Sequence, residues 1–390
     1  MGLDVLVVSG IWPPAVGGPA SHVPEVGAFL NARGHRVRAI TSAVGPVDPA
    51  IVPLLVLRQG RPLPVRMAQG AGALVRAARA ADVIYASGFY SRSALAGAAT
   101  GTPLVVKLTN DPAFERARSR GWFSGTLEEF QHESRDPRAG ALKLLRTQSL
   151  RRASSVVVPS RFLAGIVQGW ARDIAEPVVI PNPRPDLPAR QARAVLRQQR
   201  SLHEFTAVFA GRFVADKQLH IALEAVARVP ACHLVLVGDG PERGAVEAAV
   251  HRLRLNDRVR IEGPARREEV LDWLQAGDVA VLSSGWENYP HAAVEALSVG
   301  TPVVATAVGG VPEIVSDGEN GMLVARGDVE GLAGALKRCV HDTEWVQRLR
   351  SGATAIRPGV DRDTAYAELE RLLLSAASRR VTRSPGDEPG

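Results

Sequence analysis

The sequence predicts an α/β protein built from two doubly wound domains. Short, fully apolar runs alternate with helical patterns along most of the 390 residues, which is typical of parallel sheets covered by helices on both faces. Residues 180–188 contain four prolines in nine positions, and this much proline excludes both a helix and a central strand. We therefore interpret this segment as a linker that joins an N-terminal domain over 1–185 to a C-terminal domain over 186–363.

The expected elements follow one another in the order strand, loop, helix. In the N-terminal domain, a glycine- and proline-rich loop over 9–20 leads from the first strand into a helical pattern over 21–33, which ends at Gly34. Glycine is favoured there because it adopts the left-handed conformation easily. The strands expected in this domain cover residues 3–8, 37–40, 82–85, 103–108 and 155–158.

The same alternation restarts after the linker. The strands expected in the C-terminal domain cover residues 207–210, 233–237, 259–262, 279–283 and 302–305, with helices between them. A final helical pattern over 364–380 is able to pack on either domain. The polar tail over 381–390 is expected to be disordered.

Composition limits the class of protein. The chain has 47 Lys and Arg, 40 Asp and Glu and 46% hydrophobic residues, as ordinary globular proteins have. Its two cysteines predict neither a disulfide framework nor a cysteine metal site. Because there is no signal-peptide pattern and no apolar run of about 18 residues, we expect a cytoplasmic protein without a membrane span.

The positive charge is concentrated in the first half of the chain. Residues 1–190 hold 23 Lys and Arg against 13 Asp and Glu, whereas residues 191–390 hold 24 against 27. This asymmetry favours an anionic partner of the N-terminal domain, such as a phosphorylated acceptor, a membrane surface or nucleic acid. An arginine-rich proteome is the alternative explanation.

A glycine pair lies between a strand and a helix in each domain, as Gly17-Gly18 and as Gly309-Gly310. Glycines let a ligand approach the backbone, and the amides at the start of the next helix attract anions. Two tight turns would need the same residues. Their equivalent positions favour a phosphate ligand, held in a cleft at the carboxyl ends of the two sheets.

Two carboxylates flank the start of a helix in the C-terminal domain. Pro290 suits the first helical position, so Glu287 is expected in the preceding loop and Glu295 inside the helix. Glu287 can accept hydrogen bonds from ligand hydroxyls. Glu295 lies on a nearly apolar helix, where a carboxylate needs partners; ribose hydroxyls or protein donors would supply them.

Two cations follow the strand that ends at Ala210. Arg212 and Lys217 lie five residues apart, and they are able to clamp a diphosphate through charge-assisted contacts of about 1.5–3 kcal/mol each. A solvated pair on a loop is the alternative. The sequence contains no Asp-x-Asp pattern in this region, and we expect no metal site and no bound cofactor.

Taken together, these motifs resemble the retaining nucleotide-sugar glycosyltransferases of family 4, which have the GT-B fold of two Rossmann-like domains facing each other across a cleft. Five segments carry the resemblance in the C-terminal domain: Glu287-x7-Glu295, Gly211-Arg212 with Lys217, 237–243, 300–306, and 309–313 followed by Asn320-Gly321. The resemblance extends to Gly17-Gly18, Gly34-His35, Pro159-Ser160 and 180–182, so it covers nearly the whole chain.

The resemblance implies that a sugar moves from a UDP- or GDP-linked donor to an acceptor hydroxyl, with retention and without a metal. Arg212 and Lys217 would hold the diphosphate and Glu295 the ribose. Glu287 would hold the sugar, with Asn288 beside it in the donor site. Gly17, Gly18, Gly309 and Gly310 would lie close to the phosphates. The N-terminal domain would receive the acceptor, and the helix over 364–380 would pack back on that domain.

The chain departs from the family pattern in the N-terminal domain. Many relatives have a histidine that contacts the donor sugar where this chain has Asn110 and Asp111, so we expect one of these two to take over a catalytic role. Lys107 and Glu115 belong to the same polar cluster and are expected to bind the acceptor. Asp111-Pro112 is equally a plain helix-start signal.

The implied acceptor is a phosphorylated or lipid-linked molecule, and peripheral contact with the inner membrane surface would bring such an acceptor to the basic domain. Binding of nucleic acid is not expected. The alternatives are a catalytically silent nucleotide-sugar-binding protein and a GT-B epimerase. Turnover of a donor by the purified protein would separate the transferase from the silent protein.

Overall fold

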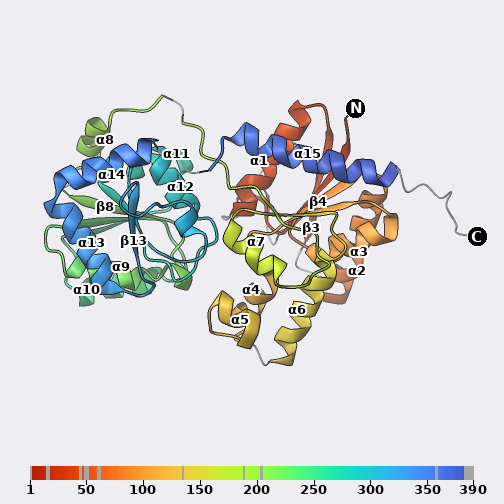
Figure 1. Ribbon diagram of the computed structural model, residues 1–390, viewed down its shortest axis with the longest axis horizontal. Helices are drawn as coiled ribbons and strands as arrows, with labels where there is room; N and C mark the ends of the chain where they lie inside the picture. Colours follow the sequence, from red (N-terminus) through yellow and green to blue (C-terminus); the bar gives the residue numbers. More distant parts are fainter. Residues whose placement is uncertain are drawn as a thin grey trace, which may run out of the picture. The chain divides into compact units, whose positions relative to one another are not determined.

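The chain divides into two α/β units in a computed structural model (Figure 1). Unit 1 comprises Met1–Pro181 and Asp363–Gly390, and unit 2 comprises Asn182–Arg362. The structure describes residues 2–14, 18–43, 46–47, 52–58, 63–133, 136–187, 189–202, 205–355 and 359–381. No helix in these ranges is both long and apolar enough to cross a membrane.

Unit 1 contains a seven-stranded parallel sheet with the strand order β3-β2-β1-β4-β5-β6-β7. Its strands are β1 (Asp4–Ser9), β2 (Arg36–Ala43), β3 (Leu54–Arg58), β4 (Val83–Ser87), β5 (Leu104–Lys107), β6 (Ser155–Val158) and β7 (Val178–Val179). Its helices are α1 (Gly18–Ala32), α2 (Leu63–Arg79), α3 (Tyr90–Thr100), α4 (Pro112–Ser119), α5 (Leu127–Glu133), α6 (Pro137–Leu150), α7 (Arg161–Gln168) and α15 (Arg362–Val381).

Alternate strand residues face opposite sides of this sheet. One face packs against α2, α3 and α7, and the residues that form this core include Leu6, Ile84, Val106 and Val156. The other face is covered by α1, because His22 of α1 lies 2.8 Å from the Tyr85 hydroxyl of β4. Side chains at neighbouring positions of one strand therefore face different helices.

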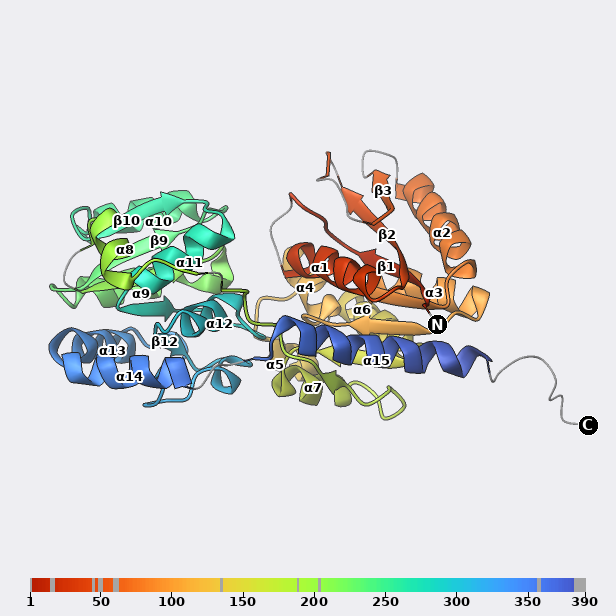
Figure 2. The same cartoon turned by 90° about the horizontal axis from the view of Figure 1, so that it is seen from above.

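Helix α15 packs on α1, although it is far away in the sequence (Figures 1 and 2). The Tyr366 hydroxyl donates to Glu25 Oε2 at 2.8 Å, and the Tyr366 ring meets the Phe29 ring edge-on. His35 Nε2 lies 2.9 Å from Glu370 Oε1, while its Nδ1 accepts from the Leu3 amide. These contacts bring the last described helix of the chain into unit 1.

Unit 2 contains a six-stranded parallel sheet with the strand order β10-β9-β8-β11-β12-β13. Its strands are β8 (Thr206–Ala210), β9 (His233–Val237), β10 (Val259–Gly263), β11 (Val279–Leu282), β12 (Val303–Thr306) and β13 (Gly321–Val324). Its helices are α8 (Arg193–Gln199), α9 (Leu219–Ala227), α10 (Arg243–Arg252), α11 (Arg267–Ala276), α12 (His291–Ser298), α13 (Val329–His341) and α14 (Thr343–Ala355), and the 3₁₀ turns are η1 (Ala215–Lys217) and η2 (Val311–Glu313).

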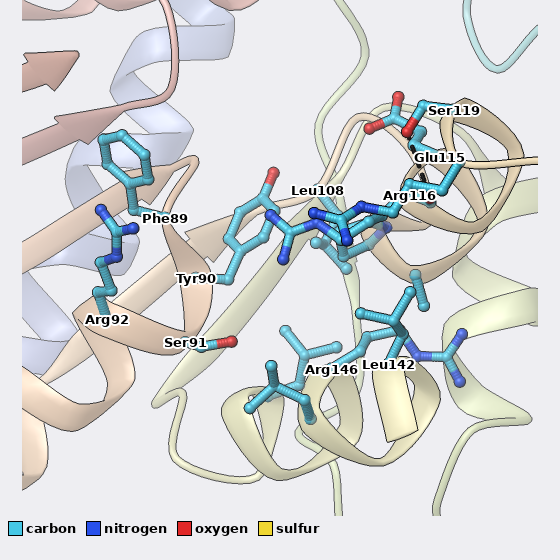
Figure 3. Close-up of a pocket in the computed structure, with 15 residues that line it drawn as sticks. Phe89, Tyr90, Ser91, Arg92, Leu108, Glu115, Arg116, Ser119, Leu142 and Arg146 are labelled. Carbon is cyan, nitrogen blue, oxygen red and sulfur yellow. Dashed lines mark hydrogen bonds between the residues drawn. The ribbon is translucent and has the colours of Figure 1, made fainter. Parts of the chain in front are cut away.

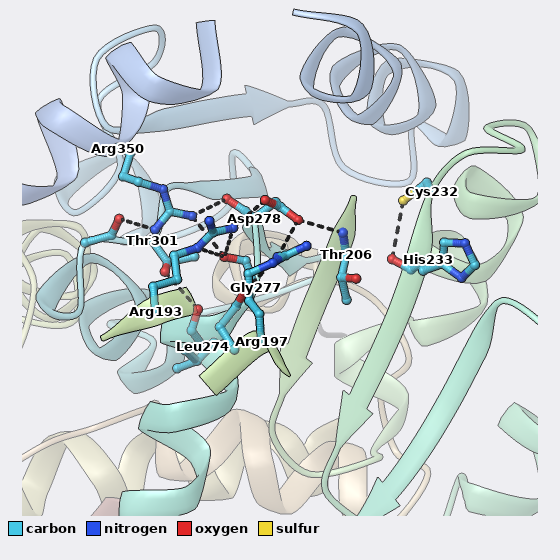
Figure 4. Close-up of polar contacts among 12 residues, drawn as sticks. Arg193, Arg197, Thr206, Cys232, His233, Leu274, Gly277, Asp278, Thr301 and Arg350 are labelled. Carbon is cyan, nitrogen blue, oxygen red and sulfur yellow. Dashed lines mark hydrogen bonds and ion pairs between the residues drawn. The ribbon is translucent and has the colours of Figure 1, made fainter. Parts of the chain in front are cut away.

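A charged cluster precedes β11 at the amino edge of this sheet (Figure 4). Arg193 and Arg197 of α8 both pair with the Asp278 carboxylate, which also accepts from the Thr206 amide at 2.8 Å. Arg350 of α14 donates to the Asp278 carbonyl oxygen at 3.1 Å. These contacts fasten α8 and α14 to the sheet.

The observed sheets confirm the expected α/β class with two parallel sheets. Three strands were not expected from the sequence, namely β3 and β7 in unit 1 and β13 in unit 2. All three lie at a sheet edge and contain partly exposed residues such as Leu55. Short edge strands give a weak sequence signal because they need not be apolar on both faces.

Candidate functional site

The loops that follow β8 and β9 lie in close contact at the carboxyl edge of the unit 2 sheet. A Cβ atom on Gly238 would lie 1.9 Å from the Gly211 carbonyl oxygen, and Gly238 has a φ of 148°. Beyond the two glycines, the Phe213 amide donates to the Asp239 carbonyl at 2.9 Å. Only glycine fits at position 238, and its absence of a side chain allows the two strand ends to meet.

The loop after β11 is tied to the loop after β8 by hydrogen bonds. The Ser283 hydroxyl donates to the Lys217 carbonyl at 2.9 Å, and the Gly285 amide donates to the Asp216 carbonyl at 2.8 Å. Lys217 is the last residue of η1, just before α9. These bonds bring Lys217 beside Glu287, which is 70 positions away in the sequence.

The Glu287 carboxylate is buried in this site, because the residue is only 8% exposed. Its Oε1 forms an ion pair with Lys217 Nζ and accepts from the Ser284 hydroxyl at 2.7 Å. Its Oε2 accepts no hydrogen bond from the described residues. A buried carboxylate needs compensation, and here one oxygen is compensated while the other keeps its capacity to accept.

Glycine residues shape the adjoining loop before η2. Gly309 has a φ of 54°, in the left-handed region, and the Gly310 amide donates to the Glu287 carbonyl at 3.2 Å. The loop that carries the second glycine pair therefore lies against the loop that carries Glu287. Asn288, which follows Glu287, is 5% exposed.

Glu295 lies on α12 with its side chain 13% exposed. Burial raises its pKa, and the neighbouring Arg267 opposes this rise. Arg267 Nε lies 3.3 Å from Glu295 Oε1. Ribose hydroxyls and protein donors were the two possible partners of Glu295, and Arg267 is a protein donor. Its part could not be predicted from the sequence, because Arg267 begins a different helix, α11.

The other predicted donor residues lie in different settings. Arg212 is exposed, directly after Gly211. Gly18 is the first residue of α1, and Gly17 lies outside the described residues. That these residues bind the donor stays a prediction. Pro290 is the N-cap of α12 and not its first residue, so the helix begins at His291, one position later than expected.

In unit 1, the contacts of Asp111 are those of a helix cap. The residue is fully buried. Its Oδ1 accepts from the Ala113 amide at 2.8 Å and the Phe114 amide at 3.3 Å. Its Oδ2 pairs with Arg146 and accepts from Gln131 Nε2 at 3.1 Å. Both oxygens are engaged and buried, and Asp111 starts α4 and joins it to α5 and α6. Its expected catalytic role stays a prediction.

The neighbouring polar residues remain closer to the surface. Asn110 Nδ2 donates to Glu115 Oε1 at 2.6 Å, and Asn110 Oδ1 accepts from the Asp111 amide. Glu115 is exposed. Lys107 is different, because it ends β5 in the interior and is 2% exposed. The structure thus separates four residues that are close in sequence into a cap, a surface pair and a buried cation.

A pocket of about 780 Å³ opens in unit 1 between α3, α4 and α6 (Figure 3). Apolar side chains form much of its wall, and arginines surround them. The lining includes Phe89, Tyr90, Leu108, Leu142, Leu145 and Leu150 with Arg92, Arg116, Arg120 and Arg146. The figure shows Phe89 and Arg92 on the side opposite to Glu115 and Ser119. Such walls suit a ligand with an apolar part and a negative charge.

Among the described residues, no group of three or more His, Cys, Asp or Glu side chains is placed to hold a metal ion. The two cysteines are free and buried, and burial raises the pKa of the Cys232 thiol to about 12. Cys232 is therefore held as the neutral thiol and not as a reactive thiolate.

Two family models match the chain. The model described as glycosyl transferases group 1 matches residues 194–355, and the model of a glycosyl transferase 4-like domain matches residues 17–183. The first model covers the loops that carry Lys217, Glu287 and Glu295. The second covers most of unit 1.

Relatives of known name that match the chain are also glycosyltransferases. The chain is 40% identical over 139 residues to the lipopolysaccharide core biosynthesis glycosyltransferase LpsE of Rhizobium meliloti, which covers 36% of this chain and 40% of the relative. It is 34% identical over 211 residues to a D-inositol 3-phosphate glycosyltransferase of Streptomyces griseus, covering 50% of this chain and 45% of the relative. These matches span about half of each relative or less.

A solved structure matches over nearly the whole chain. It is that of Anabaena Alr3699/HepE in complex with UDP, with a TM-score of 0.76 and 25% identity, and the match covers 95% of this chain and 100% of that one. The two family models, the relatives and this fold agree, and the chain therefore belongs to the group 1 glycosyltransferases with a family 4-like N-terminal half and the GT-B fold.

Proposed function

We propose that this protein transfers a sugar from a UDP-linked donor to an acceptor hydroxyl, with retention of the anomeric configuration and without a metal ion. The observation that carries the proposal is the partly buried Lys217–Glu287 pair at the carboxyl edge of β8 and β11. Ligands bind at this edge in open parallel sheets. The match to a structure named as a complex with UDP supports uridine as the base.

The donor would change the partners of this pair. Lys217 and Glu287 compensate each other in the chain without ligand. A diphosphate carries more negative charge than one carboxylate, so Lys217 would turn toward it, together with the exposed Arg212. Glu287 would then accept from sugar hydroxyls, with Asn288 next to it. The Gly309-Gly310 loop would face the phosphates, and Glu295 would bind ribose beside Arg267.

The chemical contribution of these residues is electrostatic. Negative charge grows on the departing diphosphate as the glycosidic bond breaks, and cations fixed beside that oxygen lower the barrier. Because Lys217 and Arg212 would supply this charge, the transfer needs no metal. Retention would follow from front-face attack, in which the leaving phosphate oxygen takes the acceptor proton.

The pocket between α3, α4 and α6 is the site that we propose for the acceptor. Its apolar wall and its arginines Arg92, Arg116 and Arg120 fit an amphiphilic anion, such as a phosphorylated or lipid-linked molecule. The exposed side chains Leu95, Leu144 and Leu145 belong to α3 and α6. They would favour contact of this face with a membrane surface.

Calorimetry with UDP, GDP, ADP and TDP tests the donor half of the proposal. We expect heat of binding with UDP, followed by release of UDP from a matching UDP-sugar when an acceptor is present, at an unchanged rate in EDTA. No binding of any nucleoside diphosphate would refute the proposal. Binding of UDP without hydrolysis or transfer of any sugar would identify a silent nucleotide-sugar-binding protein instead.

Dodecyl phosphate is a suitable probe of the acceptor pocket. Replacement of Arg116 and Arg120 by Gln should weaken its binding by about 10-fold, since each charge-assisted contact contributes on the order of 1 kcal/mol or more. Arg118→Gln is the matched control, because Arg118 is on the same helix but packs over the Phe114 ring outside the pocket lining. Equal losses in both variants would remove the pocket from the proposal.

A further inference from the structure

A row of polar side chains crosses the carboxyl edge of the unit 1 sheet. Ser9 of β1 is paired in register with Ser87 of β4. Ala86 of β4 is paired with Val106 of β5, so the next residues along these strands, Ser87 and Lys107, are also neighbours. Three adjacent strands therefore end in a serine, a serine and a lysine.

These three side chains share one face of the sheet. The residues next to them, Val8, Ala86 and Val106, belong to the core on the side of α2, α3 and α7. By the alternation of strand residues, Ser9, Ser87 and Lys107 face the side covered by α1. The row is thus separated by the sheet from the pocket between α3, α4 and α6.

The cation in this row has no counter-ion among the described residues. The Lys107 ammonium forms no hydrogen bond or ion pair with any described residue, although the residue is only 2% exposed. The Ser87 hydroxyl is also buried without a hydrogen-bond partner. Burial alone lowers the pKa of Lys107 to about 8. An isolated buried ammonium is costly, and the row offers a positive charge and a hydroxyl to which no described residue is bonded.

Two glycines continue the strands beside this row. Gly10 and Gly88 directly follow Ser9 and Ser87, and their backbones are close, since a Cβ on Gly88 would lie 2.3 Å from the Gly10 nitrogen. A Cβ on Gly10 would meet no atom within 4 Å. The first position after each of these two strands therefore adds no side chain next to the row.

We propose that Lys107 and Ser87 form a phosphate-binding site at the carboxyl edge of the unit 1 sheet. This site lies on the other face of the sheet from the pocket proposed for the acceptor, and it takes inorganic phosphate or a phosphomonoester. The phosphate would pair with the Lys107 ammonium and accept from the Ser87 hydroxyl. The site stands on unit 1 alone.

The chain has only four lysines, Lys107, Lys143, Lys217 and Lys337, so each can be followed separately by NMR of the full chain labelled at lysine. Single Lys→Met variants assign the four signals. Addition of inorganic phosphate should shift the Lys107 signal saturably and raise its titration midpoint above about 8, because a bound anion favours the charged amine. The exposed Lys337 is the control. No saturable shift of Lys107, or an equal shift of Lys337, would overturn the site.

The Lys107→Met variant gives a second readout, from thermal unfolding. Methionine fills similar space and needs no counter-ion, so the variant should have a higher Tm than the parent protein in phosphate-free buffer. Phosphate should raise the Tm of the parent more than that of Lys107→Met, through linkage to binding. Lys337→Met should behave as the parent does. A lower Tm for Lys107→Met without phosphate, or equal responses to phosphate, would contradict the proposal.

The same spectra separate this inference from the proposed function. UDP should move the Lys217 signal, and a failure to do so would count against the donor site and not against the phosphate site. In a Lys217→Met variant, UDP should leave the Lys107 signal in place. If UDP moved it more than phosphate does, the bound phosphate would belong to the donor, and the inference of a phosphate site separate from the donor would fall.

Discussion

The two ends of strand β11 carry charged clusters that differ in how completely their charges are matched. At the amino end, the Asp278 carboxylate is paired with Arg193 and Arg197, and it accepts from the Thr206 amide (Figure 4). At the carboxyl end, Glu287 has one cation, Lys217, and one hydroxyl, and Oε2 accepts nothing from the described residues.

This difference indicates that the two charged clusters of unit 2 have different purposes. A carboxylate whose donors come from two arginines and a backbone amide fixes the elements that supply them. A buried pair with one unused oxygen is able to exchange its partners for a ligand, because each charge gains new contacts as it loses the other. We infer that the first cluster holds the sheet together and that the second is reserved for substrate.

The largest expected effect is on stability at the amino end. Asp278→Ala removes the carboxylate and leaves two partly buried cations uncompensated, which should lower the free energy of unfolding by about 3 kcal/mol. Chemical denaturation measures this loss. Glu330→Ala is the control in the same unit, because Glu330 forms an exposed pair with Arg228 and surface pairs contribute about 0–1 kcal/mol. Similar losses in the two variants would contradict the comparison.

The next effect is on turnover at the carboxyl end. Glu287→Gln keeps the shape of the side chain but loses its charge, so contacts with the sugar should weaken in the transition state. We expect kcat to fall by about 10- to 100-fold, as for the loss of one charge-assisted hydrogen bond. The Kd for UDP, measured by calorimetry, should change much less. A normal kcat would remove Glu287 from the sugar site.

Lys217→Met should act mainly on binding of the nucleotide. The variant loses the cation that we assign to the diphosphate, so the Kd for UDP should rise by about 10- to 100-fold. The double variant Lys217→Met/Glu287→Gln replaces both charges and should unfold at nearly the parent Tm, since neither partner is left buried alone. Unchanged affinity in the single variant would place the diphosphate elsewhere.

The smallest effect is the pH dependence that arises from Glu295. Burial raises the pKa of this carboxyl in the folded protein, so the folded state prefers its neutral form. Its contribution to stability is complete below the pKa of the unfolded chain and is lost as pH rises through the higher folded pKa. As pH rises between the unfolded and the folded pKa of Glu295, the free energy of unfolding of the parent protein should therefore fall more than that of Glu295→Gln. The opposite slope, measured by denaturation at a series of pH values, would show that Arg267 outweighs burial.

The sequence was a better guide to unit 2 than to unit 1. In unit 2, the expected strands recur with small shifts at their ends. Lys217 and Glu287, which were both expected at the carboxyl edge of the sheet, form an ion pair there. In unit 1, the sequence places Asp111 and Lys107 in one polar cluster. In the structure, Asp111 caps a helix and Lys107 lies in the buried row at the sheet edge. Local pattern does not show the direction in which each strand residue points or which distant arginine reaches it.

The amino-acid sequence alone determined the α/β class, the two-part organisation and the family, because apolar runs, glycines and paired carboxylates carry local physical requirements that can be read in order. Only the tertiary structure decided which charges have partners. Arg267 pairs with Glu295 and Arg146 pairs with Asp111, whereas Lys107 has no counter-ion in the part of the chain that the structure describes. These are outcomes of packing, since a charge separated from its partner by tens of residues is matched only when the chain folds.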